Sequence, residues 1–142
     1  MTTGKTIGAV FPINSSQASR FFDEGRRVFV KFTNMSNFKT NSKIVLYVTK
    51  EKVLVGEGTV KIVQRMLTSE AWRKYNQDVF LNQDEYNKYA SWSTIGQKTR
   101  SNAEVTVFVL KNLRRYRKSQ PFKGMTPSGR YLSEEEYSKI NS

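Results

Sequence analysis

The residues with the clearest potential for chemistry are cations gathered late in the chain. Between residues 98 and 130 the sequence holds nine Lys or Arg against a single acid, Glu104. The densest part is residues 114–118 (RRYRK), where four cations enclose one aromatic residue, Tyr116. A polyanion that replaces its condensed counterions with such side chains gains free energy by counterion release, whatever its base sequence. The pattern predicts that the chain binds nucleic acid.

Other residue types in the sequence suit the same partner. Arginine offers a planar fork to phosphate oxygens, and an aromatic ring among cations can stack on a base. Phe38 stands in the polar loop 33–42 without an obvious packing partner, and Lys31 projects from the strand before that loop. The candidate nucleic-acid-binding residues are Lys31, Phe38, Lys39, Lys98, Arg100, Arg114, Arg115, Tyr116, Arg117, Lys118, Lys123 and Arg130.

Each of these residues also has a plainer interpretation. A basic face can serve solubility or meet an anionic membrane surface, because charge determines association rather than fold. Tyr116 can cover a sheet edge, and Phe38 can be buried locally. Arg130 can line a pocket or tie a C-terminal helix to the rest of the molecule. Glu57, between Gly56 and Gly58, is explained most simply by a salt bridge with a nearby Lys.

Absent residue types exclude several functions. The chain has no Cys and no His, so it can form neither a disulfide framework nor an imidazole-based catalytic triad or zinc site. Residues 124–130 (GMTPSGR) resemble a phosphate loop only superficially, because the Gly-Lys-Ser/Thr ending is missing. We expect no metal, no cofactor and no nucleoside triphosphate hydrolysis.

Composition and length indicate one folded domain over residues 1–142. The chain has a net charge of +12, and 37% of its residues are hydrophobic, which is enough to build a core. No apolar run approaches the roughly 18 residues of a membrane span, and the first residues lack a secretory signal. We therefore expect a cytoplasmic protein that does not enter a membrane. The sequence leaves its oligomeric state open.

Alternating and β-branched runs predict the strands of this domain. They cover residues 7–11, 28–32, 44–49, 53–63 and 105–110. Gly56 and Gly58 predict a bend or bulge in the fourth run, and the fifth is apolar on both faces, as in a central strand. The basic cluster follows that strand immediately, so a rigid scaffold should position it. The basic segment 111–130 is expected to pack on the domain and to become irregular from residue 119.

Capping signals predict four short helices. Three pairs have the spacing of a capping box: Asn14 with Gln17, Asn82 with Glu85, and Ser133 with Glu136. Thr68 can cap the remaining helix. The helices should cover residues 15–24, 69–75, 83–91 and 134–140, with Gly25 ending the first. Together these elements predict an α+β fold in which five or six mostly antiparallel strands curl into a small barrel flanked by short helices.

The sequence resembles the PUA-like superfamily, and particularly its ASCH and EVE branches. After a strand and a helix that begins near Asn14, the runs 27–32 (RVFVKF), 43–48 (KIVLYV) and 55–60 (VGEGTV) follow in the order typical of these barrels. Residues 128–137 (SGRYL followed by EEEY) are similar to the end of an uncharacterised archaeal family placed near this superfamily. The resemblance covers residues 7–63 and 105–137.

This resemblance implies a PUA-like pseudobarrel that binds RNA, or a modified base in DNA, in a cleft between barrel strands and flanking helices. Only Lys31 is carried over as a site residue, since the ASCH signature Gly-x-Lys-x-x-x-x-Arg is not evident. The first functional hypothesis is a non-enzymatic nucleic-acid-binding domain, with RNA preferred and DNA possible. The second is a metal-independent ribonuclease of ASCH-like type that uses Lys31 and Tyr47 in place of histidine. The third is an interaction module of a ribosome or another complex.

Overall fold

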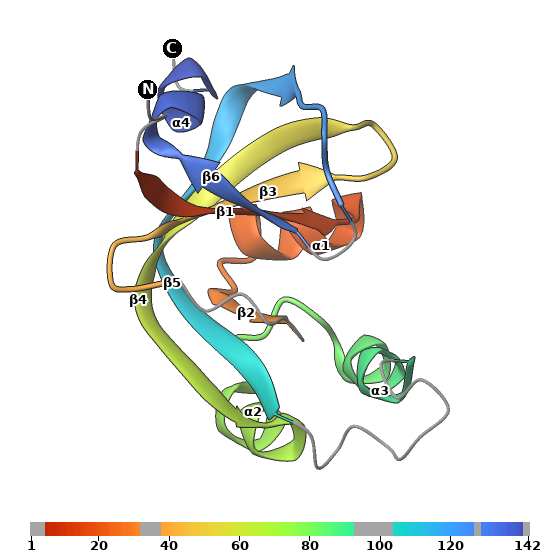
Figure 1. The fold of residues 1–142 in the computed structure, drawn as a ribbon. Coiled ribbons are helices and arrows are strands. Elements are labelled where there is room, and N and C mark those ends of the chain that lie inside the picture. Colours follow the sequence, from red (N-terminus) through yellow and green to blue (C-terminus); the bar gives the residue numbers. More distant parts are fainter. Residues whose placement is uncertain (1–4, 32–37, 93–103, 127–128, 141–142) are drawn as a thin grey trace.

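The computed structural model describes residues 5–31, 38–92, 104–126 and 129–140 (Figure 1). Its elements, in chain order, are β1 (Thr6–Ile13), α1 (Ser15–Phe22), β2 (Val28–Lys31), β3 (Lys43–Val48), β4 (Val53–Leu67), α2 (Thr68–Tyr75), α3 (Gln83–Trp92), β5 (Glu104–Pro121), β6 (Arg130–Ser133) and α4 (Glu134–Ile140).

The strands form one curled sheet in the order β2-β5-β4-β3-β1-β6. Strands β1 and β3 pair in parallel, and the other four pairings are antiparallel. The two edge strands do not pair with each other, so the sheet is curved but open. The predicted α+β class, with a small, mostly antiparallel pseudobarrel and flanking short helices, is confirmed.

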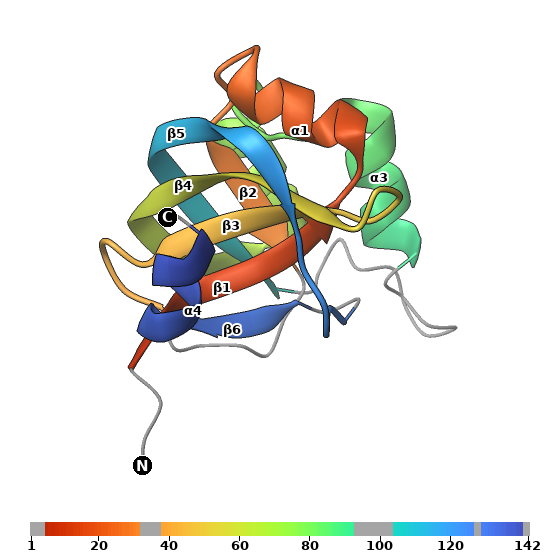
Figure 2. The same ribbon diagram turned by 90° about the horizontal axis from the view of Figure 1, so that it is seen from above.

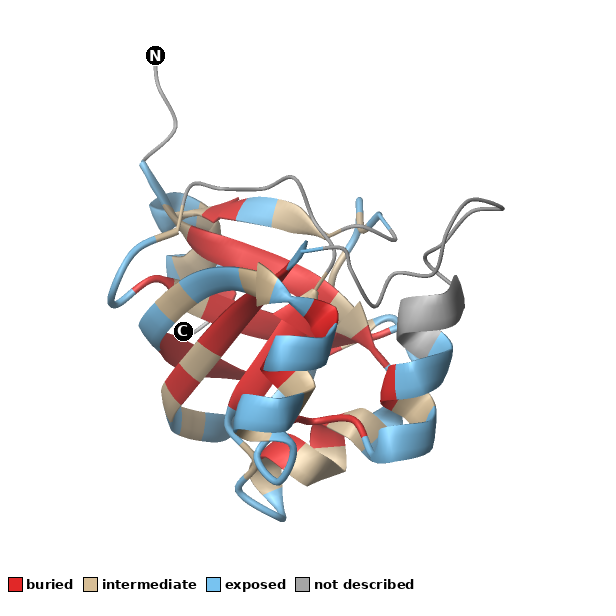
Figure 3. Cartoon of the chain, turned by 90° about the horizontal axis from the view of Figure 1, so that it is seen from below, coloured by how far each residue is buried: buried red, intermediate tan, exposed pale blue. Residues whose placement is uncertain are grey.

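Side chains of the central strands alternate between two hydrophobic cores, as the pleat of a strand requires. On β1, Phe11 belongs to the larger core and Val10 to the smaller; on β3, Leu46 and Tyr47 divide in the same way. Helices α1, α2 and α3 contribute to the larger core, whereas α4 contributes Ile140 to the smaller one. The helices accordingly lie on different sides of the sheet (Figure 2) and bury one face each (Figure 3).

The long strands β4 and β5 correct two predicted boundaries. The sequence predicts strands over 53–63 and 105–110, but the pair continues to Leu67 and to Pro121, respectively. The segment 111–121 is mostly polar, with Leu113, Tyr116 and Pro121 as its apolar residues, so its side chains give no alternating strand pattern. Backbone pairing with β4 holds it in the sheet. The basic cluster is therefore part of a strand and does not follow one.

Capping boxes determine where the helices begin. Asn14 caps α1, and the amide of Gln17 donates to its Oδ1 at 2.8 Å. The predicted boxes at Asn82 and Ser133 are confirmed by the reciprocal bonds with Glu85 and Glu136. The cap of α2 is Leu67, one residue before the predicted Thr68. Helix α1 ends at Phe22, and Gly25 follows with a φ of 74° that favours glycine.

Two further observations concern membranes and metals. In the part of the chain that the structure describes, no helix has the length and apolarity needed to cross a membrane. Among the same residues, no three Asp or Glu side chains gather as a metal site requires.

Candidate nucleic-acid interface

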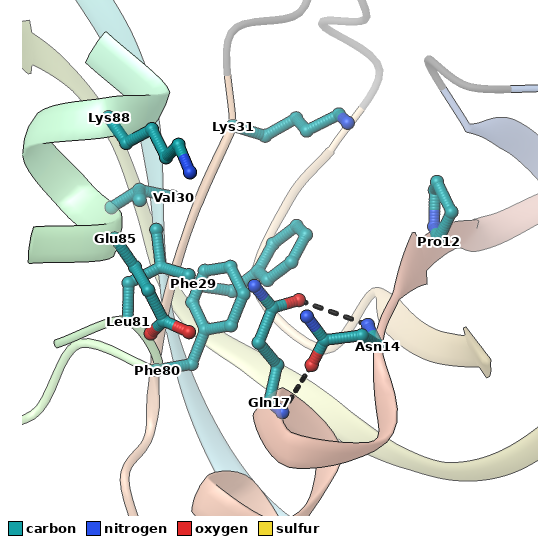
Figure 4. Close-up of a pocket in the computed structure, with 10 residues that line it drawn as sticks. All are labelled: Pro12, Asn14, Gln17, Phe29, Val30, Lys31, Phe80, Leu81, Glu85 and Lys88. Carbon is teal, nitrogen blue, oxygen red and sulfur yellow. Dashed lines mark hydrogen bonds between the residues drawn. The ribbon is translucent and has the colours of Figure 1, made fainter. Parts of the chain in front are cut away.

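A pocket of about 440 Å³ opens between α1, β2 and α3 (Figure 4). Its floor is apolar and is formed by Phe29, Val30, Phe80 and Leu81, with Pro12 at one side. Its rim is polar and is formed by Asn14, Gln17, Lys31, Glu85 and Lys88. An apolar cavity with a few convergent polar groups is the usual form of a ligand site in proteins.

The floor of this pocket is rigid because its rings belong to the larger core. The Phe29 and Phe80 ring centroids lie 4.9 Å apart, and Phe80 stacks on Phe21 of α1 at 5.1 Å. All three side chains are at most 5% exposed. A flat apolar ligand could therefore contact the floor without rearranging the core.

One wall of the pocket is locked by an ion pair between two helices. Arg20 of α1 donates to the Glu85 carboxylate of α3, and it also donates to the Phe80 carbonyl at 3.1 Å. Glu85 Oε1 additionally accepts the Asn82 backbone N–H at 2.9 Å. The Glu85 charge is thus compensated by Arg20, and Lys31 and Lys88 make the rim electropositive.

Lys31 occupies the end of β2, where the sequence predicted a binding cation. Its Nζ lies 6.0 Å from the centroid of the Phe11 ring, and burial lowers the pKa of the ammonium group below its usual value. Desolvation disfavours the charged form, so an anionic ligand placed beside the ammonium group would favour that form again. Figure 4 shows Lys31 and Lys88 at the same end of the pocket.

Phe38 and Lys39 are the first residues of the neighbouring loop that the structure describes. Phe38 is half-buried and packs edge-on against Phe108 at 4.8 Å, with Tyr131 at 5.8 Å. Local burial therefore accounts for much of this ring, and its stacking on a base stays a prediction. Lys39 is exposed, and its backbone N–H donates to Ser42 Oγ at 3.0 Å.

The basic cluster sits on a β-bulge. Gly56 of β4 pairs with Arg115 of β5, and Leu54 of β4 pairs with Gln120 of β5. A step of two residues on β4 thus faces a step of five residues on β5. The intervening residues of β5 leave the ladder, as in a large bulge, and bulges turn side chains away from the sheet. Arg117 and Lys118 are exposed there, as is Lys123 beyond the strand, and no ion pair joins them to a carboxylate among the described residues.

Arg114 and Tyr116 belong to a polar network around Glu57, whose side chain is only 5% exposed. Its carboxylate accepts hydrogen bonds from Tyr116 at 2.9 Å and from Tyr137 at 2.7 Å. Arg114 Nη2 lies 3.2 Å from the same carboxylate, and Lys43 Nζ lies 3.9 Å from it. Burial, followed by the Glu57 charge and hydrogen bond, raises the pKa of Tyr116. Tyr116 is thus a buried structural residue, and a base cannot reach its ring in this arrangement.

Two further arginines from the predicted set are also paired with carboxylates. Arg115 reaches both Asp23 oxygens at 3.1 Å and lies over the Phe22 ring. Arg130 donates to Glu136 of α4 and lies 4.8 Å from the Phe122 ring centroid. Although burial opposes the shift, the Ser133 backbone N–H and Arg130 lower the pKa of Glu136. Arg130 therefore ties α4 to the sheet.

The structure does not bring all predicted residues to one surface. Arg114 faces α4 and the smaller core, whereas its neighbour Arg115 faces α1. Tyr47, the second catalytic candidate, is 7% exposed in the smaller core, on the opposite side of the sheet from Lys31. Lys98 and Arg100 lie outside the described residues.

Several pocket residues were missed as site residues by the sequence analysis. Asn14, Gln17 and Glu85 were predicted only as helix caps, and Phe80 and Lys88 were not singled out. One signal for them was available in the sequence. Asn14 caps a helix that directly follows a strand, and this strand-to-helix junction lines the pocket. An ion pair between Arg20 and Glu85 joins α1 to α3, and these two residues are 65 positions apart in the sequence.

Comparison with known proteins agrees with this architecture. A family model described as a domain of unknown function (DUF365) matches residues 6–134. The chain belongs to the DUF365 family. None of the curated proteins compared with this DUF365 chain matches it.

Solved structures show that the DUF365 chain has a PUA-like fold. The ASCH protein of Zymomonas mobilis superimposes with a TM-score of 0.76 at 17% identity, covering 95% of this chain and 94% of its own. The N-terminal domain of McrB from Staphylothermus marinus superimposes with a TM-score of 0.59 at 17% identity, covering 99% and 97%. At this identity the likeness establishes the fold, and the fold that the resemblance in the sequence implied is confirmed.

Proposed function

We propose that this chain is a non-enzymatic nucleic-acid-binding domain, with RNA preferred and DNA possible, that takes an unstacked base into the pocket between α1, β2 and α3. The observation that carries the proposal is the pairing of a rigid aromatic floor with a rim that bears Lys31 and Lys88. Sequence-specific RNA recognition commonly uses splayed bases of this kind, because bases in an A-form helix are hard to reach.

The remaining charge of the molecule supports the same partner. Phosphates on either side of the bound base would meet Lys31 and Lys88 at the rim, with Lys39 exposed nearby in the chain. Arg117, Lys118 and Lys123 provide a second set of exposed cations. Arg114, Arg115 and Arg130 are engaged with carboxylates, so phosphate contact by these three requires exchange of an existing partner.

The fold relatives favour nucleic acid over other polyanions. The PUA-like resemblance implies binding of RNA or of a modified base in DNA, in a cleft between barrel strands and helices. The pocket occupies such a cleft in this chain, since β2 supplies its floor and α1 and α3 supply its walls.

A binding panel tests the proposal. Fluorescence anisotropy with single- and double-stranded RNA and DNA of matched sequence, at two salt concentrations, should show saturable binding that weakens as salt rises. The slope of log affinity against log salt should be about −0.7 per phosphate neutralised on a single strand. Lys88→Gln should weaken binding, and Lys139→Gln, on exposed α4, is the matched control. Binding that ignores salt, or equal weakening by both variants, would contradict the proposal.

One observation favours a second candidate, metal-independent RNA cleavage. Burial lowers the pKa of Lys31, so a larger fraction of this amine is neutral and able to accept a proton than for an ordinary lysine. Single-stranded RNA incubated with the protein in chelator should then give products that Lys31→Arg abolishes, because arginine stays protonated. If the RNA binds but remains intact, cleavage is contradicted and nucleic-acid binding is the function that remains.

A further inference from the structure

The pocket presents a pair of hydrogen-bond donors whose orientation is determined by the fold. The backbone N–H of Asn14 donates to Gln17 Oε1 at 3.1 Å, and the backbone N–H of Gln17 donates to Asn14 Oδ1 at 2.8 Å. An amide oxygen and an amide nitrogen are hard to tell apart by shape, but only an oxygen can accept these two bonds. The capping box therefore fixes which end of each carboxamide faces the backbone.

Both NH2 groups consequently remain available to a ligand. Each side chain lines the pocket, and within the described residues the only hydrogen bonds of the two carboxamides are those to the backbone amides of the capping box. Figure 4 shows the two amide nitrogens on the side of the carboxamides that faces Phe29. Because the two side chains bond reciprocally, the pair of donors is presented as one unit.

The rest of the rim adds further donors, because Lys31 and Lys88 are donors only. The one carboxylate of the rim, Glu85 of α3, accepts from Arg20 and from the Asn82 backbone at Oε1, and its charge is paired with Arg20. A ligand edge placed against Asn14 and Gln17 therefore meets donors. A buried donor left without a partner costs free energy, so the ligand edge must supply acceptors.

We propose that Asn14 and Gln17 make the pocket selective for a base edge that carries two adjacent hydrogen-bond acceptors. This inference rests on the proposed function and names the base class that the same pocket would take. Guanine offers such an edge at N7 and O6, and cytosine offers one at N3 and O2. Adenine places its amino group beside N1 and N7 and offers N3 only as a single acceptor, and uracil and thymine place an N–H between their two carbonyls. Guanine and cytosine should therefore bind more tightly than adenine, uracil or thymine.

Single-stranded oligomers test this selectivity. A uniform oligo-uridine or oligo-thymidine background carries one central base, which is guanine, cytosine, adenine or unchanged, and affinity is measured by anisotropy. A good bidentate pair discriminates by roughly tenfold or more, so the guanine or cytosine oligomer should bind about tenfold more tightly than the adenine or unchanged one. Equal affinity for all four would overturn the inference while leaving the proposed function intact. Failure of every oligomer to bind would overturn both.

The Asn14→Asp/Gln17→Glu double variant provides a matched test of the mechanism. Carboxylate oxygens satisfy a capping box as well as amide oxygens do, so α1 should keep its cap and the protein should stay folded. Both donors become acceptors, and the preference should shift toward adenine, whose amino group can donate. The control, Asn76→Asp/Gln77→Glu, adds the same charge at exposed positions beyond α2 and should lower affinity for all oligomers equally. A preference that survives in the pocket double variant would show that these amides do not read the base.

Discussion

At the scale of single residues, Lys31 combines a proposed binding role with an environment that disfavours its charge. Burial lowers its pKa, so the ammonium group loses its proton at a lower pH than ordinary lysines do. If the charged form holds a phosphate, affinity for an oligonucleotide should fall as pH rises toward that lowered pKa, before other lysines titrate. Anisotropy between about pH 7 and pH 10 measures the fall.

A matched variant separates Lys31 from the other lysines. Lys31→Arg keeps its charge over this pH range, so its affinity should decline less than that of the native protein. The same substitution at exposed Lys88 should leave the native profile in place, because the lowered pKa belongs to Lys31. A profile for Lys31→Arg that matches the native one would show that Lys31 does not control binding.

Glu57 holds together the polar network beside the smaller core. Its buried carboxylate accepts hydrogen bonds from Tyr116 and Tyr137 and lies beside Arg114. Glu57→Gln removes the charge and leaves the cations without their partner, so the free energy of unfolding should drop by roughly 2 to 3 kcal/mol. Urea denaturation measures the change.

The control for Glu57 is an exposed ion pair. Glu104 and Arg65 are both about half exposed, and Glu104→Gln should cost less than about 1 kcal/mol of unfolding free energy.

One tyrosine that donates to Glu57 makes the stability of the fold depend on pH. Because burial and Glu57 raise the pKa of Tyr116, the folded state keeps a proton that the unfolded state loses above about pH 10, and stability should fall as pH rises beyond that point. Tyr116→Phe should flatten this fall; an unchanged slope would contradict the role of the phenol.

At the scale of elements, the parallel pairing of β1 with β3 depends on one glycine. A Cβ on Gly8 would lie 1.8 Å from the Lys43 carbonyl oxygen, and the two residues are the first register pair of the strands. Backbone cannot yield as a flexible side chain can, so Gly8→Ala should cost about 3 kcal/mol or prevent folding.

Gly25→Ala is the comparison for Gly8. No atom lies within 4 Å of a Cβ at Gly25, and its φ of 74° alone should cost about 1 kcal/mol. Thermal and urea denaturation of both variants give the comparison, with insoluble expression counted as failure to fold. A Gly8→Ala protein as stable as Gly25→Ala would mean that β1 can shift its register freely.

The elements also show what sequence reasoning could reach. Capping boxes at Asn14, Asn82 and Ser133 are local signals four residues long, and all three predicted the helix starts correctly. The end of β5 escaped prediction because its polar half is held by backbone bonds to β4, which leave no trace in side-chain pattern. The pocket escaped for a related reason: Lys88 of α3 and Lys31 of β2 line one pocket because the segment before α3 pairs with β2 through Val28 and Val79, and this separation in sequence carries no signal.

At the scale of the whole molecule, the cations of the pocket rim and those of the bulge in β5 lie in two separate regions. Lys31 and Lys88 flank the pocket beside α3, whereas Arg117 and Lys118 stand on the bulge in the last part of β5. Figure 1 shows the last part of β5 and α3 at opposite ends of the molecule. Lys31, Arg117 and Lys118 were all predicted as binding residues, and the fold places Lys31 in a different region from the other two. A short ligand held in the pocket can contact only the first region, while a long one can follow the surface to the second.

Ligand length should therefore decide which cations matter. Two charge-matched variants, Lys31→Gln/Lys88→Gln and Arg117→Gln/Lys118→Gln, each remove two positive charges from one region. With an oligomer of about five nucleotides, near the lower limit of small single-strand sites, only the pocket variant should weaken binding. With about 25 nucleotides, each variant should reduce the salt slope by about 1.4, the value for two phosphates on a single strand. If the bulge variant weakens the short oligomer as strongly as the pocket variant does, the ligand binds along β5, and the pocket is not the centre of recognition.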